Sequence, residues 1–354
     1  ITSLFIFCIL FVYISCTGVV NPAFLVEKQL PNPILAVVGY DSATDQLTVS
    51  ATLSEDLLDS ESGFSYNWLV DDVAVEADGD TLTYTVSGDQ LTYNITCFFS
   101  KTGRDDSDPV SADVNLIALV PSLRLWLDGA DETSFTYDAD KKISKWADKS
   151  GFGNDADQVE LTSSPMFVDL IQNDNSIVRF DGIDDHFRDV FTIPTSNMTI
   201  FSVFSHKHST VEAAKGPLWQ TNGYAAASGF YPYYETRQRV ATSNSAWLEE
   251  SSRFRSDSWH LAEIVYGINS VELYKNGVVD SSASLNTVDN GGFQIAKSTL
   301  NEYFKGDIGE ILFFNGSLTS SLTANVQNYL MAKWGISQTQ SILETHAANI
   351  MHRH

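Results

Sequence analysis

The stretch Lys145–Gln158, KWADKSGFGNDADQ, gathers aspartates and glycines in the manner of a calcium loop, an acidic catalytic cluster or a tight turn. In an EF-hand alignment Asp148 takes the first position and Gly153 takes the sixth, where the backbone turns sharply. Phe152 then falls on a ligand position without an oxygen, and Val159 falls where a bidentate glutamate is required. The spacing therefore excludes an EF-hand.

A glycoside hydrolase on a β-sheet could place two carboxylates on one strand face, two residues apart. No Glu-x-Asp-x-Glu run occurs, and Asp307 and Glu310, three residues apart, point to opposite faces of a strand. The signatures of serine hydrolases, zinc proteases and P-loop nucleotide hydrolases are also missing. We therefore expect no enzyme, although sequence cannot pair carboxylates from distant strands.

The segment RFDGIDDHF holds three aspartates within five residues: Asp181, Asp184 and Asp185. Carboxylates clustered in a loop could bind calcium, which takes six to eight oxygen ligands. Three acids fall short of that number, so a solvated turn is the alternative interpretation. Calcium is the one cofactor that the sequence suggests, and none is certain.

Aromatic and arginine side chains gather in the middle of the second half of the chain. Such residues stack on sugar rings and donate hydrogen bonds to hydroxyls, but they also fill the core of a β-sandwich. The candidate carbohydrate-binding residues are Trp219, Tyr231, Tyr233, Tyr234, Arg237 and Trp247.

The composition limits the partners of the protein. The formal net charge of -24 and the pI near 4.4 disfavour binding to nucleic-acid phosphates. The acidic residues are scattered, as is typical of a soluble extracellular surface. A glycan or a surface protein is the expected partner, and a membrane is expected only through an N-terminal anchor.

The N-terminal segment, residues 1–20, is apolar from Leu4 to Ile14 and has the length of a signal-peptide core rather than of a spanning helix. Its YISC ending resembles the lipobox of bacterial lipoproteins, which implies lipidation at Cys16. Tyr13 departs from the aliphatic residue usual in that motif, so an ordinary cleaved signal or an uncleaved anchor stays open. We expect a secreted or cell-surface protein, with an outer-membrane lipoprotein as the finer prediction.

Residues 21–32 contain a proline-rich linker, and residues 33–119 contain short alternating strands separated by Asp, Gly and Ser turns. This pattern predicts a small β-sandwich with Trp68 and Tyr93 in its core. Trp68 and the YNITC segment resemble an immunoglobulin-like or PKD-like module. No cysteine stands in the second strand, so Cys97 is expected to be a buried thiol rather than half of a disulfide.

Short alternating runs in residues 121–338 predict a second, larger set of strands. Residues 339–354 lack such a pattern and are expected to form a flexible tail. Near the end, apolar residues from Val326 to Trp334 follow helical spacing, with caps in Thr319 to Thr323 and a stop at Gly335. The fold class is thus all-β: a small sandwich, then a jelly roll with one C-terminal helix.

Five segments between Leu123 and Ile336, including LRLWLDGAD, VRFDGIDDHF and FKGDIGEILFFNG, resemble the laminin-G-like, concanavalin-A-type jelly roll of bacterial and phage surface proteins. The resemblance implies that the opening stretch is architectural. Trp146 would pack inward, Gly151 and Gly153 would take positive φ, and Asp148 with Asn154 would bond the turn amides.

These expectations combine into a non-catalytic surface protein, in which an immunoglobulin-like stalk presents a laminin-G-like domain for carbohydrate or protein binding in adhesion or glycan capture. One alternative is a structural component of a surface layer, filament or virion. A second alternative is a glycan-active hydrolase, because one fold hosts lectins, enzymes and structural modules.

Overall fold

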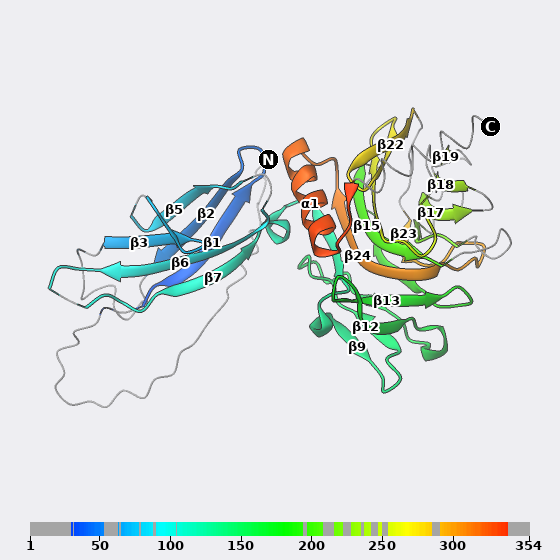
Figure 1. Cartoon of the computed structure of the whole chain (residues 1–354), viewed down its shortest axis with the longest axis horizontal. Helices are drawn as coiled ribbons and strands as arrows, with labels where there is room; N and C mark the ends of the chain where they lie inside the picture. The colour runs from blue at the N-terminus through cyan, green and yellow to red at the C-terminus, as the bar shows by residue number, and fades with distance from the viewer. Residues whose placement is uncertain are drawn as a thin grey trace, which may run out of the picture. The chain divides into compact units, whose positions relative to one another are not determined.

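The computed structural model describes residues 30–338, except 31, 53–62, 64, 78, 88–89, 104, 194–196, 208–215, 222–227, 235–236, 242–246, 250–253 and 285–290. The chain divides into two compact units, Ile1–Leu119 and Val120–His354. Figure 1 shows both units as β-structures, with one described helix, α1, in the second. These features confirm the predicted fold class.

Two antiparallel sheets form the first unit. One sheet has the strand order β1-β2-β5 and the other has the order β4-β3-β6-β7. Its strands are β1 (Ile34–Asp41), β2 (Gln46–Thr52), β3 (Ser65–Val70), β4 (Val73–Val75), β5 (Thr81–Thr85), β6 (Thr92–Ser100) and β7 (Val110–Asn115).

The core of this unit contains the predicted residues. Trp68 and Tyr93 are 2% and 1% exposed, because alternate residues of β3 and β6 face inward. The Tyr93 hydroxyl accepts a hydrogen bond from the Ser87 amide at 2.9 Å, which satisfies the one polar atom of a buried ring. Cys97 is a buried free thiol, as predicted, and burial raises its pKa to about 12.

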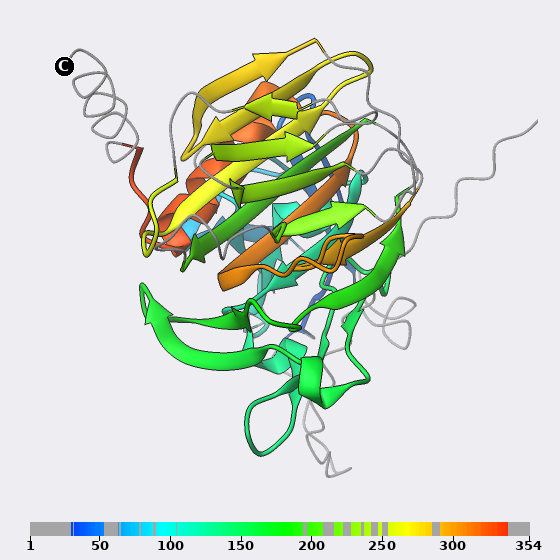
Figure 2. The ribbon, with the colours of Figure 1, turned by 90° about the vertical axis from the view of Figure 1, so that its right-hand side faces the viewer.

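The second unit packs two large sheets face to face. The larger sheet has the order β12-β13-β24-β15-β20-β21-β22, with β8 also paired to β24, and the other has the order β14-β23-β16-β17-β18-β19. Figure 2 views the six-stranded sheet face on. Aromatic and aliphatic side chains from both sheets form one core between them.

The strands of the larger sheet are β8 (Leu123–Asp128), β12 (Met166–Gln172), β13 (Asn175–Asp181), β15 (Met198–His206), β20 (His260–Tyr266), β21 (Val271–Lys275), β22 (Val278–Ala283) and β24 (Lys305–Asn315). Those of the six-stranded sheet are β14 (Phe187–Thr192), β16 (Trp219–Thr221), β17 (Gly229–Tyr234), β18 (Arg237–Ala241), β19 (Trp247–Glu249) and β23 (Gly292–Ile295).

A small third sheet, β11-β10-β9, stands beside the two large ones. Its strands are β9 (Phe135–Tyr137), β10 (Ile143–Trp146) and β11 (Ala156–Asp157). The helix α1 (Ser320–Lys333) packs against β20 near the C-terminal end of the described chain. Thr319 caps it by accepting a hydrogen bond from the Leu322 amide at 3.2 Å, within the predicted cap region.

The turn between β10 and β11 is architectural, as predicted. Asp148 accepts hydrogen bonds from the amides of Trp126 and Ser150, each at 2.9 Å, and from the Asn154 amide at 3.0 Å. Gly151 and Gly153 adopt φ values of 86° and 70°, which side chains rarely tolerate. One carboxylate thus holds the turn together and ties it to β8.

Asp148→Ala should destabilise the second unit by about 2 to 4 kcal/mol, because three backbone amides lose their acceptor at once. Thermal unfolding followed by near-ultraviolet circular dichroism would measure the loss. Asp140→Ala, at an exposed carboxylate in the neighbouring turn, is the control and should leave the melting temperature almost unchanged. Equal melting temperatures for Asp148→Ala and the wild type would refute this role.

Candidate functional site

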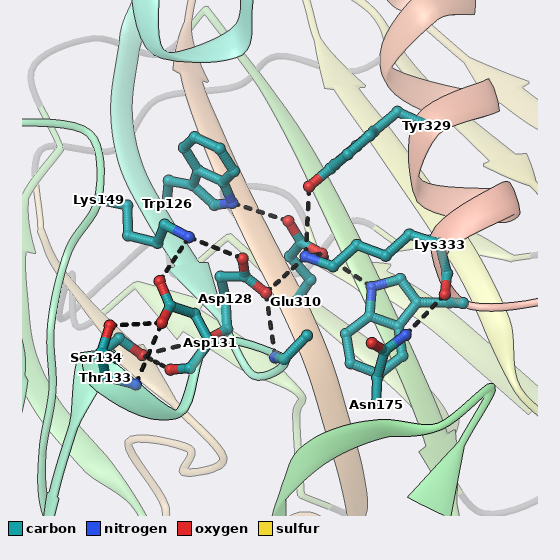
Figure 3. A network of polar contacts seen from close by, with 12 residues as sticks. Trp126, Asp128, Asp131, Thr133, Ser134, Lys149, Asn175, Glu310, Tyr329 and Lys333 are labelled. Carbon is teal, nitrogen blue, oxygen red and sulfur yellow. Dashed lines mark hydrogen bonds and ion pairs between the residues drawn. The ribbon is translucent and has the colours of Figure 1, made fainter. Parts of the chain in front are cut away.

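A buried network of charges joins β8, β24 and α1 (Figure 3). Both Glu310 carboxylate oxygens accept indole hydrogen bonds at 2.8 Å, one from Trp126 and the other from Trp334. Lys333 Nζ lies 2.8 Å from Glu310 and 2.6 Å from Asp128. Lys149 Nζ lies 3.0 Å from the other Asp128 oxygen.

This network contains two carboxylates in register on neighbouring strands, Asp128 and Glu310, but it is closed to substrates. Glu310 is 0% exposed. Its pKa is raised mainly by burial and, to a lesser extent, by the negative charge of Asp128. Lys333 and the Trp334 indole donor oppose that rise. Because protein donors occupy both Glu310 oxygens, this pair is structural rather than catalytic.

Two of the predicted carbohydrate-binding residues lie inside the protein. Trp219 is 0% exposed and stacks on Phe293, with ring centroids 5.7 Å apart, while Tyr231 is 4% exposed. The prediction of stacking platforms at Trp219 and Tyr231 is therefore wrong. Trp219 packs between the sheets with Phe230, its register partner on β17, so aromatic composition here reflected core packing.

The other four candidates lie on described strands, but their side chains lie outside the described part of the structure. Tyr233 and Tyr234 are in β17, and Arg237 pairs with Tyr234 across β17 and β18. Trp247 pairs with Ala241 across β18 and β19. Their role in sugar binding stays a prediction.

The aspartate-rich turn after β13 brings its three acids together. One carboxylate oxygen from each of Asp181, Asp184 and Asp185 lies within 4.8 Å of the others. Asp181 accepts a hydrogen bond from the Ile183 amide at 2.8 Å, and Asp185 accepts one from the Asp181 amide at 2.9 Å. Hydrogen bonds within the turn thus account for part of the clustering.

Asp185 is the buried member of the turn. It is 2% exposed, and its Oδ1 atom has no hydrogen-bond partner but lies 3.6 Å from Lys142 Nζ. Burial, aided by the charges of Asp181 and Asp184, raises the pKa of Asp185 to about 6. Because the Lys142 ammonium already faces the inner oxygen, these residues fit a calcium ion poorly, and calcium stays a prediction.

A surface pocket of about 570 Å³ opens beside the small sheet. We call it the β9–β11 pocket. Its volume is in the range of small-molecule sites, and it is a shallow, open depression rather than an enclosed cavity. The lining residues are Tyr137, Asp138, Ser144, Asp157, Gln158, Val159 and Leu161.

Two carboxylates line the β9–β11 pocket from different parts of the chain. Asp138 follows β9, and its Oδ1 accepts hydrogen bonds from the Asp140 and Lys142 amides at 3.0 and 2.9 Å. Asp157 ends β11 and is exposed. The sequence alone does not reveal this pair, because only the pairing of β10 with both β9 and β11 brings the two residues together.

The first unit has a pocket of about 480 Å³ on the sheet that contains β3 and β6. Its lining residues are Tyr66, Asn67, Trp68, Leu69, Ala74, Val75, Glu76, Ala77 and Phe98. Glu76 is the one carboxylate among them, so this pocket lacks the paired acids of the β9–β11 pocket.

The predicted lipidation residue Cys16, the signal segment and the C-terminal tail lie outside the described residues. Within the described part of the chain, α1 and the shorter helical turns lack the length and apolarity needed to cross a bilayer.

The chain was compared with known families, curated proteins and solved structures. No family model and no curated protein matches it. Solved structures do match, at identities that inform only on fold.

Domain 4 of a GH43 extracellular arabinanase from Geobacillus stearothermophilus, in complex with arabinotriose, is 13% identical, with a TM-score of 0.37 over 58% of this chain and 98% of that chain. Trypanosoma rangeli sialidase is 10% identical, with a TM-score of 0.44 over 80% of this chain and 48% of that chain. A GH54 α-L-arabinofuranosidase mutant is 12% identical, with a TM-score of 0.41 over 85% of this chain and 63% of that chain. The chain thus spans about half the length of the sialidase.

These findings correct two predictions from sequence. The chain was expected to be a non-catalytic surface protein and not an enzyme, yet the solved structures that match it include glycoside hydrolases. The expectation rested on the absence of a single-strand carboxylate motif, which says nothing of acids contributed by different strands.

The buried Asp185 makes stability depend on pH. A carboxyl whose folded pKa lies above its unfolded value stabilises the fold below the unfolded pKa, near 4, and this stabilisation is lost as the pH rises through about 6. Asp185→Asn removes the titration but keeps the size of the side chain. The variant should therefore gain about 1 to 3 kcal/mol relative to wild type between pH 4 and pH 7.5.

Melting temperatures of both proteins across that range would check this prediction. Asp184→Asn, at a more exposed acid of the same turn, serves as the control and should show a smaller change. A difference between Asp185→Asn and wild type that stays constant with pH would contradict the account.

Proposed function

We propose that the protein is a glycoside hydrolase that binds its glycan in the β9–β11 pocket and uses Asp138 and Asp157 as the carboxyl pair. The observation that carries the proposal is the presence of both carboxylates in the lining of one pocket. Hydrolysis of a glycosidic bond needs two carboxyl groups flanking the bond, one to donate a proton and one to act as nucleophile or base.

Asp138 is suited to the second of these roles. Two amides donate to its Oδ1 and so hold the carboxyl group in a fixed orientation. Its Oδ2 makes no hydrogen bond to the described protein, so it could face the sugar. A fixed carboxylate could attack the anomeric carbon or activate a water molecule.

Asp157 supplies the other carboxyl of the pair. It is exposed at the end of β11 and forms no side-chain hydrogen bond or ion pair within the described residues. Its neighbour across the sheet, Lys145, is instead ion-paired with Asp155. Because no described protein group bonds to it, this carboxyl is free to turn toward the glycosidic oxygen of a bound sugar.

The rest of the lining is suited to a sugar. Tyr137, Val159 and Leu161 supply apolar surface, and Val159 is 88% exposed. Ser144 and Gln158 supply polar groups for hydroxyls. Apolar surface beside a few fixed polar groups is the usual composition of a carbohydrate site.

The proposal also covers where the protein is located, what the first unit does and what the protein binds. We propose a secreted or cell-surface protein in which the N-terminal segment directs export, with lipidation at Cys16 as the specific form. The first unit would serve as an immunoglobulin-like spacer for a laminin-G-like second unit. A glycan is the proposed partner.

The test is the release of new reducing ends from a panel of plant, bacterial and animal polysaccharides. Asp138→Asn and Asp157→Asn should each lower kcat on the best substrate by about 10³-fold, because each removes one member of the acid–base pair. Binding should survive both changes. Asp140→Asn, in the same turn as Asp138 but outside the pocket lining, should keep near-wild-type activity.

Two outcomes would overturn the assignment. One is the absence of hydrolysis across the panel by correctly folded protein. The other is hydrolysis that both asparagine variants retain, which would place the active site elsewhere.

A further inference from the structure

Three cations gather near the aspartate-rich turn without a carboxylate partner in the described structure. They are Arg188 in β14, Lys297 after β23 and Lys305 at the start of β24. The whole chain has 21 lysines and arginines against 45 acids, so most of its cations can find an acid nearby. Three unpaired cations in one place are therefore unusual for this protein.

Lys297 provides the main evidence. The residue is only 7% exposed, and its ammonium lies 5.3 Å from the centroid of the Tyr303 ring. Lys297 and Tyr303 also form an isolated β-bridge, which fixes their backbones side by side. The stem of this lysine is buried and its ammonium has no counter-ion among the described residues, so the ammonium is available to an anion.

The other two cations surround the same place. The charges of Lys297 and Arg188 add to burial in lowering the pKa of His186, which puts both cations near this ring. Lys305 on β24 pairs in register with Asp181 on β13. A Cβ atom added to Gly182 would lie only 2.6 Å from the Cβ of Lys305. Gly182, with φ of 78°, thus permits the close approach of Lys305.

The described acids nearby form no ion pair with these cations. The innermost acid, Asp185, faces Lys142 at 3.6 Å, and Asp181 is bonded to amides of its own turn. Arg188, Lys297 and Lys305 form no ion pair with these aspartates. The three side chains are therefore free to pair with an anionic ligand.

A chain of contacts joins these cations to the β9–β11 pocket. Gln158 lines the pocket, and its Nε2 donates a hydrogen bond to the His186 carbonyl at 2.7 Å. The His186 ring contacts the Tyr303 ring at 5.8 Å between centroids, and Lys297 lies over that ring. The cations thus lie close to the wall that Gln158 forms on one side of the pocket.

We propose that Arg188, Lys297 and Tyr303 form a subsite for an anionic sugar unit of the glycan, with Lys305 at its edge. The cations would pair with a carboxylate or sulfate, and the partly exposed Tyr303 would contact the sugar ring. The inference builds on the proposed hydrolase and names its substrate class, a polyanionic glycan.

The test compares three oligosaccharides by isothermal titration calorimetry with the full chain. They are hexagalacturonate, its neutral counterpart hexagalactose, and a sulfated galactan hexasaccharide. At low salt one of the anionic ligands should bind at least about tenfold more tightly than the neutral one, and higher salt should reduce the difference. Which anionic ligand binds better identifies uronate or sulfate as the charged group.

Variants locate the effect. Lys297→Gln should remove most of the anionic preference, and Lys297→Arg should keep it, because arginine retains the charge. Lys101→Gln removes the same charge from the first unit and should change nothing. Melting temperatures show whether each variant is folded.

The outcomes for the two proposals are separate. Equal affinity for charged and neutral ligands, or a preference that Lys297→Gln preserves, would overturn the anionic subsite even if hydrolysis occurs. An anionic preference that is lost in Lys297→Gln would support the subsite whether or not the protein hydrolyses glycans. The absence of hydrolysis in the reducing-end assay would overturn only the proposed hydrolase.

Discussion

The ion pair between Glu310 and Lys333 is the interaction on which the second unit depends most. Glu310 lies in the middle of β24, which pairs with β15 along one edge and with β13 and β8 along the other. Lys333 is in the last turn of α1, where a positive charge also suits the helix dipole. Removing one partner of such a buried pair typically costs about 3 to 5 kcal/mol, because the other charge is left unpaired.

A series of ion pairs and hydrogen bonds connects this pair to the β9–β11 pocket. Lys333 and Lys149 both bind Asp128 at the end of β8, and Lys149 also binds Asp131 at 2.8 Å. The next links belong to the turn: Asp148 accepts from the Trp126 amide, and Asp155 accepts from the Asp148 amide at 2.8 Å. The small sheet that bears the pocket is thus attached to the sandwich by charge and hydrogen bonds as well as by the packing of Trp146.

Those parts of the fold that depend on local chemistry were predictable from sequence. Helical spacing, a threonine cap and Gly335 located α1, and the pattern around Asp148 located a turn held by its own side chains. In both cases residues close in the chain make the decisive contacts, so the sequence contains most of the information.

The functional residues were harder to predict, for two physical reasons. Alternation on a strand shows that two faces differ, but not which face is the core or whether other structure covers the second face. Trp219 lies on the core face, and Tyr231, beside the core residue Phe230, is buried as well. Asp138 and Asp157 belong to different strands, and only the pairing of β10 with both neighbours brings them to one pocket. The unpaired state of Lys297 was equally hidden, because it depends on the absence of a spatial neighbour.

The most direct test of the central claim is a crystal structure of the Asp157→Asn protein with an oligosaccharide that the wild type cleaves. Our account predicts the sugar in the β9–β11 pocket, with one glycosidic oxygen within about 3 Å of the residue 157 side chain and the Asp138 carboxylate beside the same bond. A sugar bound on the outer face of the six-stranded sheet, with the pocket empty, would contradict it.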